Sequence, residues 1–166
     1  MLIATTPLIC LVIGVTDGDT LTVRCPPPDE RVKVRIAAID APERGRPYSR
    51  LSRQSLVQLC HGQQAFVQAR DVDRYDRIVA DVRCQGKDAA QHQVASGMAR
   101  VYDRYAQEGY SYLYPQQDKA QSQRLGIWKK PSAPWRRKRT PASGTPASNA
   151  VAPPNKMRNE LPKLNL

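Results

Sequence analysis

The chain has 166 residues and a formal net charge of +11, which leaves room for one domain with a modest core and a tail. Residues 129–166 hold nine Lys or Arg against one acid, so this segment carries +8 and the first 128 residues only +3. The same segment holds seven prolines and almost no apolar periodicity, which excludes a second packed domain. We therefore expect a folded domain over 7–130 and a disordered, basic, proline-rich tail over 131–166.

The tail contains a concentrated basic block at residues 135–139, with the sequence WRRKR. Such a block attracts polyanions by releasing their counterions, and its charge also keeps a chain soluble. Two interpretations stay open: the tail tethers nucleic acid, or it is a plain solvated extension.

The first fifteen residues are apolar, which is typical of a leader peptide, but no Lys or Arg precedes Arg24. The run also lacks a small-residue cleavage site and is too short to span a bilayer. We expect a first strand here and no membrane association. Location stays open between export, to the periplasm or the medium, and the cytoplasm.

Residues 8–15 and 21–23 are rich in Val, Ile and Leu and flank the dipeptide Asp17-Gly18. This pattern predicts a β-hairpin with a two-residue turn. In that register the numbers of facing residues sum to 35, so Cys10 would face Cys25. A disulfide bond and a pair of small apolar side chains both fit facing positions.

The four cysteines, Cys10, Cys25, Cys60 and Cys84, show no C-x-x-C spacing, which argues against a zinc site. Cys60 and Cys84 either fill the core or form a second pair. A disulfide in either pair would point to an oxidising compartment.

From Arg31 the sequence alternates strictly, which predicts a half-buried third strand over 31–38. Asp40 continues the inward row of this strand, and Asp19 begins the inward row of the second strand. Two carboxylates directed toward a core are costly unless a positive charge compensates them, so we expect a cation at the mouth of a small barrel. Arg35 has the opposite parity and is expected to face solvent unless strand twist turns it into the site.

The remaining elements are predicted from periodicity and their start and stop signals. They comprise three helices and two strands joined by a basic turn: helix 48–60, strand 64–70, turn 73–77, strand 78–84, helix 88–96 and helix 115–125. Together with the first three strands they predict a small α+β domain.

Three short segments concentrate charge: residues 17–20 (DGDT), 35–43 (RIAAIDAPE) and 73–77 (DRYDR). Carboxylates that converge on one point repel each other unless a cation lies between them, and arginines beside such a cation suit a phosphate. If the three segments meet in space, they predict a metal-dependent nuclease.

Together with residues 97–102 (GMARVY) and 125–128 (LGIW), these segments resemble the staphylococcal nuclease family in order and spacing, over about residues 8–128. The resemblance implies a five-stranded OB-fold β-barrel with three helices. It also implies calcium-dependent hydrolysis of DNA and RNA with low sequence preference.

The resemblance further implies roles for individual residues. The calcium ligands would be the carboxylates of Asp19 and Asp40 and the main-chain carbonyl of Ala41. Glu43 would be the base that activates or orients the attacking water. Calcium accepts several oxygen ligands in irregular geometry, so this donor set suffices with added water.

On the substrate side, the resemblance implies that Arg35 and Arg77 grip the scissile phosphate, as guanidinium groups can with two parallel hydrogen bonds. It implies that Arg74, Tyr75 and Tyr105 contact the nucleotide. We expect nucleic acid as the partner and a monomeric protein.

The sequence departs from the family pattern at two places. Ala41 stands where threonine is common, which removes a hydroxyl, and Asp76 stands where glycine is common, which places a negative charge beside Arg77. A non-catalytic nucleic-acid-binding module on the same barrel is the alternative function. A nuclease of the PD-(D/E)-x-K type is disfavoured because Asp29-Glu30 lacks the later spaced acid and lysine.

Overall fold

The structure is a computed structural model, and it describes residues 6–26, 30–103 and 109–129. In chain order its elements are β1 (Leu8–Val15), β2 (Thr20–Cys25), β3 (Glu30–Ile36), β4 (Ile39–Asp40), α1 (Ser49–Cys60), β5 (Gln64–Val72), β6 (Ile78–Cys84), β7 (Lys87–Asp88), α2 (Ala89–Ala95), β8 (Arg100–Val101), α3 (Leu113–Ser122) and the 3-10 helix η1 (Gly126–Trp128). The predicted tail and Tyr105 lie outside the described residues.

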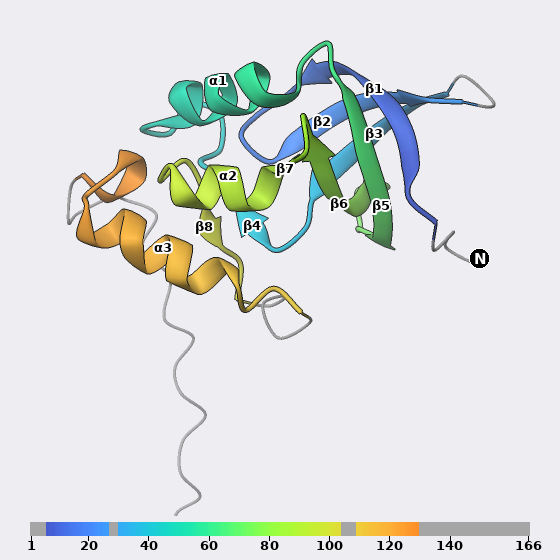
Figure 1. Cartoon of the computed structure of the whole chain (residues 1–166). Coiled ribbons are helices and arrows are strands. Elements are labelled where there is room, and N and C mark those ends of the chain that lie inside the picture. The colour runs from blue at the N-terminus through green and yellow to red at the C-terminus, as the bar shows by residue number, and fades with distance from the viewer. Residues whose placement is uncertain (1–5, 27–29, 104–108, 130–166) are drawn as a thin grey trace, which may run out of the picture. The chain divides into compact units, whose positions relative to one another are not determined.

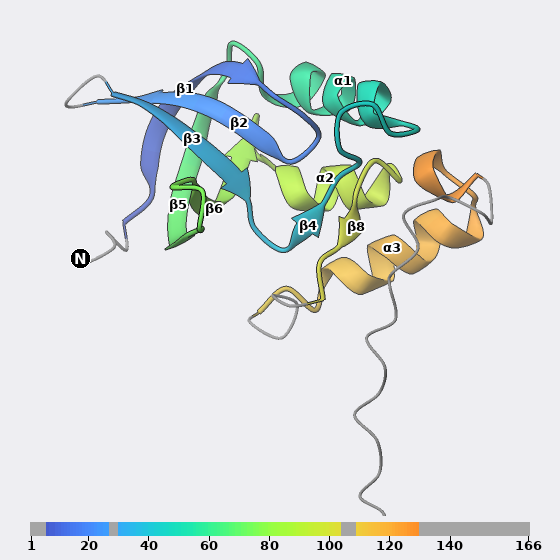
Figure 2. The same cartoon turned by 180° about the vertical axis from the view of Figure 1, so that it is seen from behind.

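Five strands form a closed barrel in the order β3-β2-β1-β5-β6, and a parallel pairing between β3 and β6 closes it. The three helices gather at one end of the barrel, and the short β4–β8 pair lies between the barrel and α3 (Figures 1 and 2). The predicted α+β fold with a five-stranded OB-type barrel and three helices is confirmed.

Alternation along the strands produces the core, as the apolar periodicity predicts. Fully buried side chains of the barrel meet others from each of the three helices; the largest include Val12, Leu21, Val23, Val34, Ile36, Leu56, Val94 and Leu113. Because the helices bury their apolar faces against one end of the barrel, they also fix the loops at that end. Among the described helices, none is both long enough and apolar enough to cross a membrane.

The β1–β2 hairpin differs from the predicted two-residue turn. The amide of Thr16 donates to the carbonyl of Thr20, so the loop holds the three residues 17–19, and near it paired numbers sum to 36. A bulge between Val12 and Gly14 then shifts the register, so that Val12 pairs with Val23 at a sum of 35. The predicted register therefore holds at the far end of the hairpin but not at its turn.

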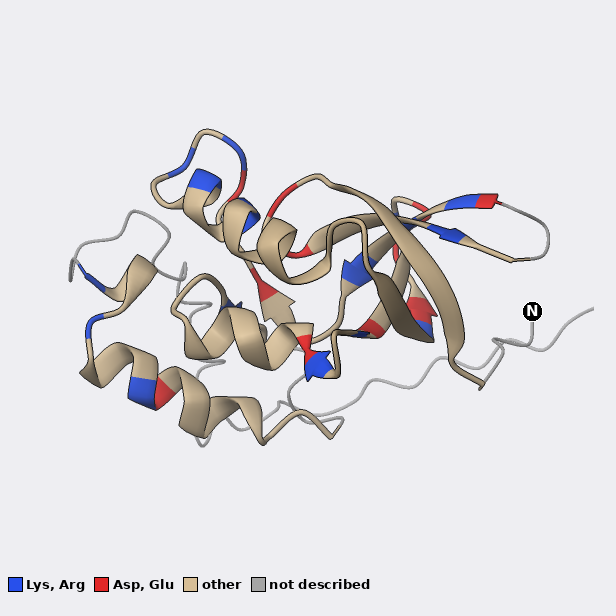
Figure 3. Ribbon diagram, turned by 45° about the horizontal axis from the view of Figure 1, so that its top comes forward, with Lys and Arg blue, Asp and Glu red and all other residues tan. Residues whose placement is uncertain are grey.

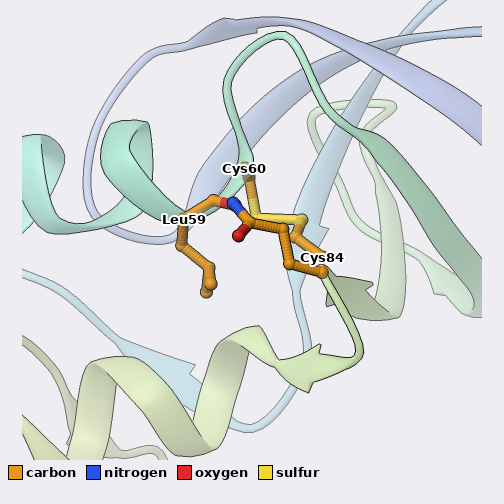
Figure 4. The surroundings of a disulfide bond; sticks show 4 residues. Leu59, Cys60 and Cys84 are labelled. Atoms are coloured by element: carbon orange, nitrogen blue, oxygen red, sulfur yellow. A yellow bond between two sulfur atoms is a disulfide. The ribbon is translucent and has the colours of Figure 1, made fainter.

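All four cysteines are in disulfide bonds, Cys10 with Cys25 and Cys60 with Cys84. The first crosslinks the hairpin, where the Cα atoms lie 4.3 Å apart. The second joins the last residue of α1 to the last residue of β6 (Figure 4). It therefore ties the helix that packs near the hairpin loop directly to the barrel wall.

Several other elements differ from their predicted bounds; β5, for example, runs to Val72 rather than to residue 70. The third strand ends at Ile36 rather than at residue 38, because Ala38 takes a left-handed backbone conformation with φ of 61° and turns the chain. The last helix spans 113–122, which begins and ends earlier than the predicted 115–125.

Candidate active site

Among the described residues, Asp19 is the most buried carboxylate, with an exposed fraction of 5%. It closes the β1–β2 loop, and its two oxygens are both engaged. Oδ2 accepts a hydrogen bond from the amide of Ala41 at 2.8 Å, and Oδ1 accepts one from the hydroxyl of Thr20 at 2.9 Å. Asp19 thus connects the hairpin loop to the segment that begins at β4.

Arg35 lies in the site, against the expectation from strand parity that it faces solvent. Its side chain is 18% exposed, and its Nη1 lies 2.9 Å from Oδ2 of Asp19. Its Nη2 donates to the carbonyl of Ile39 at 3.2 Å and lies 4.0 Å from Oδ1 of Asp40. The turn after β3 folds the chain back over this face, which parity along a single strand cannot show.

The charge state of Arg35 follows from these contacts. Burial opposes a positive charge, but the carboxylates of Asp19 and Asp40 outweigh it and raise the pKa of Arg35 above its ordinary value. The guanidinium therefore stays charged, and it bridges two acids that would otherwise repel each other.

Asp40 does not continue the row of β3 as predicted, because the turn at Ala38 ends that row. It lies instead on β4, directly opposite Arg100 on β8. Oδ2 of Asp40 accepts hydrogen bonds from Nε of Arg100 at 2.9 Å and from its Nη2 at 2.5 Å. Arg100 was not among the predicted site residues, and its place in the 97–102 motif is the only sequence signal for it.

Glu43 lines a pocket together with Asp40 and Arg100. The pocket has a volume of about 250 Å³, and its lining comprises Asp40, Ala41, Pro42, Glu43, Arg46, Arg100 and Ile127. Glu43 is exposed, whereas Ala41 is 7% exposed. Two of the three predicted metal ligands, Asp40 and Ala41, thus border the same solvent-open cavity as the predicted base Glu43, whereas Asp19 lies outside its lining.

The turn 73–77 forms a compact unit of its own. Oδ2 of Asp73 accepts from Nε of Arg77 at 2.7 Å, while Oδ1 accepts from the amides of Tyr75 and Arg77. The guanidinium carbons of Arg74 and Arg77 lie 4.8 and 5.4 Å from the centre of the Tyr75 ring. These are cation–π distances, so both guanidinium groups lie against the exposed ring of Tyr75.

This turn stands next to β3 but not in contact with the carboxylates. β6 starts directly after Arg77 and pairs in parallel with β3, with Ile78 opposite Val34. The described contacts of Arg77 are with Asp73 and Tyr75 rather than with Asp19 or Asp40. The structure therefore unites Asp19, Arg35 and Asp40 directly and places Arg77 in the turn just before the adjoining strand β6.

Asp76 occupies the left-handed region, with φ of 61°. This is the conformation that glycine adopts without strain and that aspartate tolerates better than most residues. Asp76 is exposed, and Arg77 pairs with Asp73 instead of with it. Aspartate in place of the family's glycine is therefore compatible with the turn, and the carboxylate that pairs with Arg77 is that of Asp73.

Comparison with known proteins is consistent with this arrangement. The model of the family described as staphylococcal nuclease homologue matches residues 33–130, more than half of the chain. The chain belongs to the staphylococcal nuclease family. Membership accounts for the barrel with three helices and for the motifs that supply Asp40 and Arg77.

Three relatives illustrate the range of this staphylococcal nuclease family. A micrococcal nuclease of Shigella flexneri is 32% identical over 145 residues, 81% of this chain and 82% of the relative. An uncharacterized endonuclease of Haemophilus influenzae is 34% identical over 72% of this chain and 65% of the relative. A probable staphylococcal-like nuclease CAN1 of Oryza sativa is 32% identical over 70% of this chain, which spans only 35% of that relative.

Buried polar residues that sequence analysis missed hold the hairpin loop of this family member. Nε2 of Gln93 on α2 donates to the carbonyls of Gly18 at 2.8 Å and Ser52 at 3.0 Å. The hydroxyl of Ser52 on α1 donates to the carbonyl of Met98 at 2.6 Å. Gln93 and Ser52 are both 0% exposed. Neither residue carries a motif, so only the packing of α1 and α2 on the loop reveals them.

Gly18 is required by this packing. A Cβ atom at this position would meet Oγ of Ser52 at 1.8 Å and Cβ of Ala41 at 2.8 Å. The loop therefore approaches α1 and the segment after β4 more closely than any side chain permits.

Asp17 lies on the same loop, and its Oδ1 accepts from the amide of Asp19 at 3.1 Å. Burial, and then the negative charge of Asp19, raise the pKa of Asp17 to about 6. The carboxylates of Asp17 and Asp19 thus repel each other, and both are attracted to the guanidinium of Arg35.

Within residues 6–26, 30–103 and 109–129, no group of three or more His, Cys, Asp or Glu side chains is placed to hold a metal ion. Only two carboxylates, those of Asp19 and Asp40, are described as converging on Arg35, one short of such a group. Any ion at this place would have to take further ligands from main-chain carbonyls and water.

Proposed function

We propose that the protein is a calcium-dependent nuclease that hydrolyses phosphodiester bonds of DNA and RNA with low sequence preference. Family membership and relatives named nuclease and endonuclease support a nuclease. The observation that carries the proposal is the convergence of Asp19 and Asp40 on the single guanidinium of Arg35. At such a place the carboxylates can bind a cation and the guanidinium can bind a phosphate.

The donor set suits calcium. Asp19, Asp40 and the carbonyl of Ala41 would supply oxygen ligands, and calcium binds oxygen in variable geometry and number. Both carboxylates already lie near a positive charge, which indicates that this position requires one. When bound, the ion would polarise a phosphoryl oxygen and offset the charge of the carboxylates. Ala41 would use its carbonyl in this role, so the missing hydroxyl should matter little.

Glu43 would act as the base, or at least orient the attacking water. It is exposed on the rim of the pocket that Asp40 and Ala41 line. A carboxylate at this position can accept a proton from water that enters from solvent toward a phosphate beside Arg35. Its exposure also lets the proton leave to bulk water after the reaction.

Arg35 and Arg77 would stabilise the charge that gathers on the phosphate in the transition state. Arg35 is already oriented by Asp19, and Arg77 by Asp73. Such fixed donors need little rearrangement when substrate binds. The ring of Tyr75, a residue that is 63% exposed, would stack on a base while Arg74 contacts the backbone. Tyr105 stays a predicted substrate contact outside the described residues.

The two disulfide bonds support export as the location of this activity, because such bonds persist in oxidising compartments.

The test is digestion of plasmid DNA and of RNA by the purified protein, with calcium and then with a chelator. We expect calcium-dependent degradation that Glu43→Gln and Asp40→Asn both abolish. Glu30→Gln is the matched control, because Glu30 is an exposed acid at the opposite end of β3. Equal digestion by all variants would refute the site. Binding of nucleic acid without cleavage would favour the non-catalytic module instead.

A further inference from the structure

A second groove adjoins the candidate active site on the other side of the β1–β2 loop. It has a volume of about 630 Å³ and lies between this loop, the segment after Glu43 and α1. Its lining comprises Val15, Thr16, Asp17, Arg44, Ser49, Arg50 and Arg53.

The groove is basic. Three arginines and one carboxylate, Asp17, line it, and Figure 3 shows basic residues gathered on α1 and the loop before it. Arg44 and Arg50 are exposed, and no ion pair is formed by either within the described part of the chain. Arg53 is held in place by the β1 strand, because its Nε donates a hydrogen bond to the carbonyl of Val15 at 2.9 Å. The groove thus keeps at least two guanidinium groups available to an anion.

The groove lies next to the site because neighbouring residues of the same two segments border both. The β1–β2 loop presents Asp19 toward Arg35 and Asp17 toward the groove. In the next segment Glu43 lines the active-site pocket and Arg44 lines the groove. A strand of nucleic acid bound at Arg35 therefore meets this groove as it continues along the surface.

We propose that this groove binds the sugar–phosphate backbone of the substrate strand beyond the scissile bond. The inference rests on the proposed function, because it extends the path of the same substrate. The lining holds guanidinium groups and no aromatic side chain, so it suits phosphates rather than stacked bases. Bases would stack instead at Tyr75, and the groove would add affinity without sequence preference.

The test is binding of a fluorescein-labelled 20-nucleotide single-stranded DNA, in chelator so that cleavage does not interfere, over a series of salt concentrations. The variant is Arg44→Gln/Arg50→Gln. Each lost contact to single-stranded DNA should reduce the slope of log affinity against log salt by about 0.7, and the pair by about 1.4. If the affinities are equal at 1 M salt, the same relation gives a loss of affinity of roughly 25-fold at 0.1 M salt.

The matched control is Arg31→Gln/Arg83→Gln, which removes two exposed arginines elsewhere on the barrel strands. We expect it to bind within about twofold of the unmodified protein. A mononucleotide probe, which carries no neighbouring backbone phosphate, should bind both variants and the unmodified protein alike. Each single variant, Arg44→Gln or Arg50→Gln, should show about half the change in slope.

The two proposals fail separately. If Arg44→Gln/Arg50→Gln keeps the affinity and slope of the unmodified protein, the groove is refuted whether or not the protein cuts DNA. If the variant loses affinity for the long probe alone but the unmodified protein cuts nothing with calcium, the groove stands and the nuclease activity does not. Equal losses for the long probe and the mononucleotide would also refute the groove.

Discussion

The amide nitrogen of the Gln93 side chain donates a hydrogen bond to the carbonyl oxygen of Gly18 at 2.8 Å. These residues are 75 positions apart, and the bond joins α2 to the loop that carries Asp19. Because the same nitrogen also bonds the carbonyl of Ser52, one buried amide ties the loop to both α1 and α2. The position of Asp19 therefore depends on the packing of the helices as well as on the hairpin.

Replacement of Gln93 should destabilise the protein and disturb Asp19. Gln93→Ala removes the side-chain donor to the buried carbonyl of Gly18, and leaving such a group without a partner costs roughly 1–3 kcal/mol. We expect a lower free energy of unfolding by chemical denaturation, and lower nuclease activity even where the variant is fully folded. Gln91→Ala is the control, because Gln91 is exposed on the same helix. Unchanged stability in Gln93→Ala would show that the amide does not hold the loop.

Gly18→Ala should be far more damaging than Gly14→Ala. A methyl group at residue 18 would lie 1.8 Å from Oγ of Ser52, whereas at residue 14 it would make an ordinary contact of 3.5 Å with Thr22. The loop must then move away from α1, and Asp19 moves with it. We expect a clear fall in melting temperature and activity for Gly18→Ala alone. Similar melting temperatures for the two variants would contradict the close approach.

Arg100 should act as a positioning residue for Asp40. Arg100→Ala removes both hydrogen bonds to Oδ2 of Asp40, so calcium should bind less tightly and activity should fall by roughly tenfold or more, about 1.4 kcal/mol, as for a charged hydrogen bond. Arg100→Lys keeps the charge but not the two-point geometry, and it should recover only part of the loss. Calcium titration by calorimetry separates this effect from a purely structural one. Full activity in Arg100→Ala would exclude the role.

Asp17 should make stability depend on pH. Its pKa is raised to about 6 in the folded protein, so between about pH 4 and 6 the folded state holds a proton that the unfolded chain has released. The stabilising contribution is therefore complete below about pH 4 and is lost as the pH rises through 6. Once solvent screening is allowed for, the loss amounts to roughly 1 kcal/mol.

The measurement is the free energy of unfolding in chelator from pH 4 to pH 7. Asp17→Asn should be less dependent on pH than the unmodified protein over this range. Asp118→Asn, at an exposed position on α3, should follow the unmodified protein. If the free energy of unfolding changes with pH in the same way in all three proteins, Asp17 is not the source of the pH dependence.

The disulfide bond between Cys60 and Cys84 should support stability rather than chemistry. It closes a loop with a sequence separation of 24 residues, for which the loss of unfolded-state entropy is worth about 3 kcal/mol. Cys60→Ala/Cys84→Ala should lower the melting temperature yet keep activity at temperatures where it stays folded. A reducing agent should act on the unmodified protein in the same direction. An unaltered melting temperature under reduction would contradict this expectation.

Local patterns predicted most of the fold because alternation and turn residues act over a few positions. The alternation from Arg31 identified β3, and the Asp17-Gly18 dipeptide located the first hairpin. The same short range explains the errors. The bulge between Val12 and Gly14 and the turn at Ala38 change the register without any signal in the alternation itself.

The sequence alone was enough to predict a small barrel with three helices, to indicate the family and to select Asp19, Asp40 and Arg35 as residues that belong together. These conclusions depend on local periodicity and on motifs whose order is visible along the chain. Only the tertiary structure decided that Arg35 lies in the site, that Arg100 holds Asp40 and that Gln93 holds the hairpin loop. The reason is physical: hydrogen bonds and ion pairs between residues 16 to 75 positions apart exist only after the barrel has closed and the helices have packed against its end.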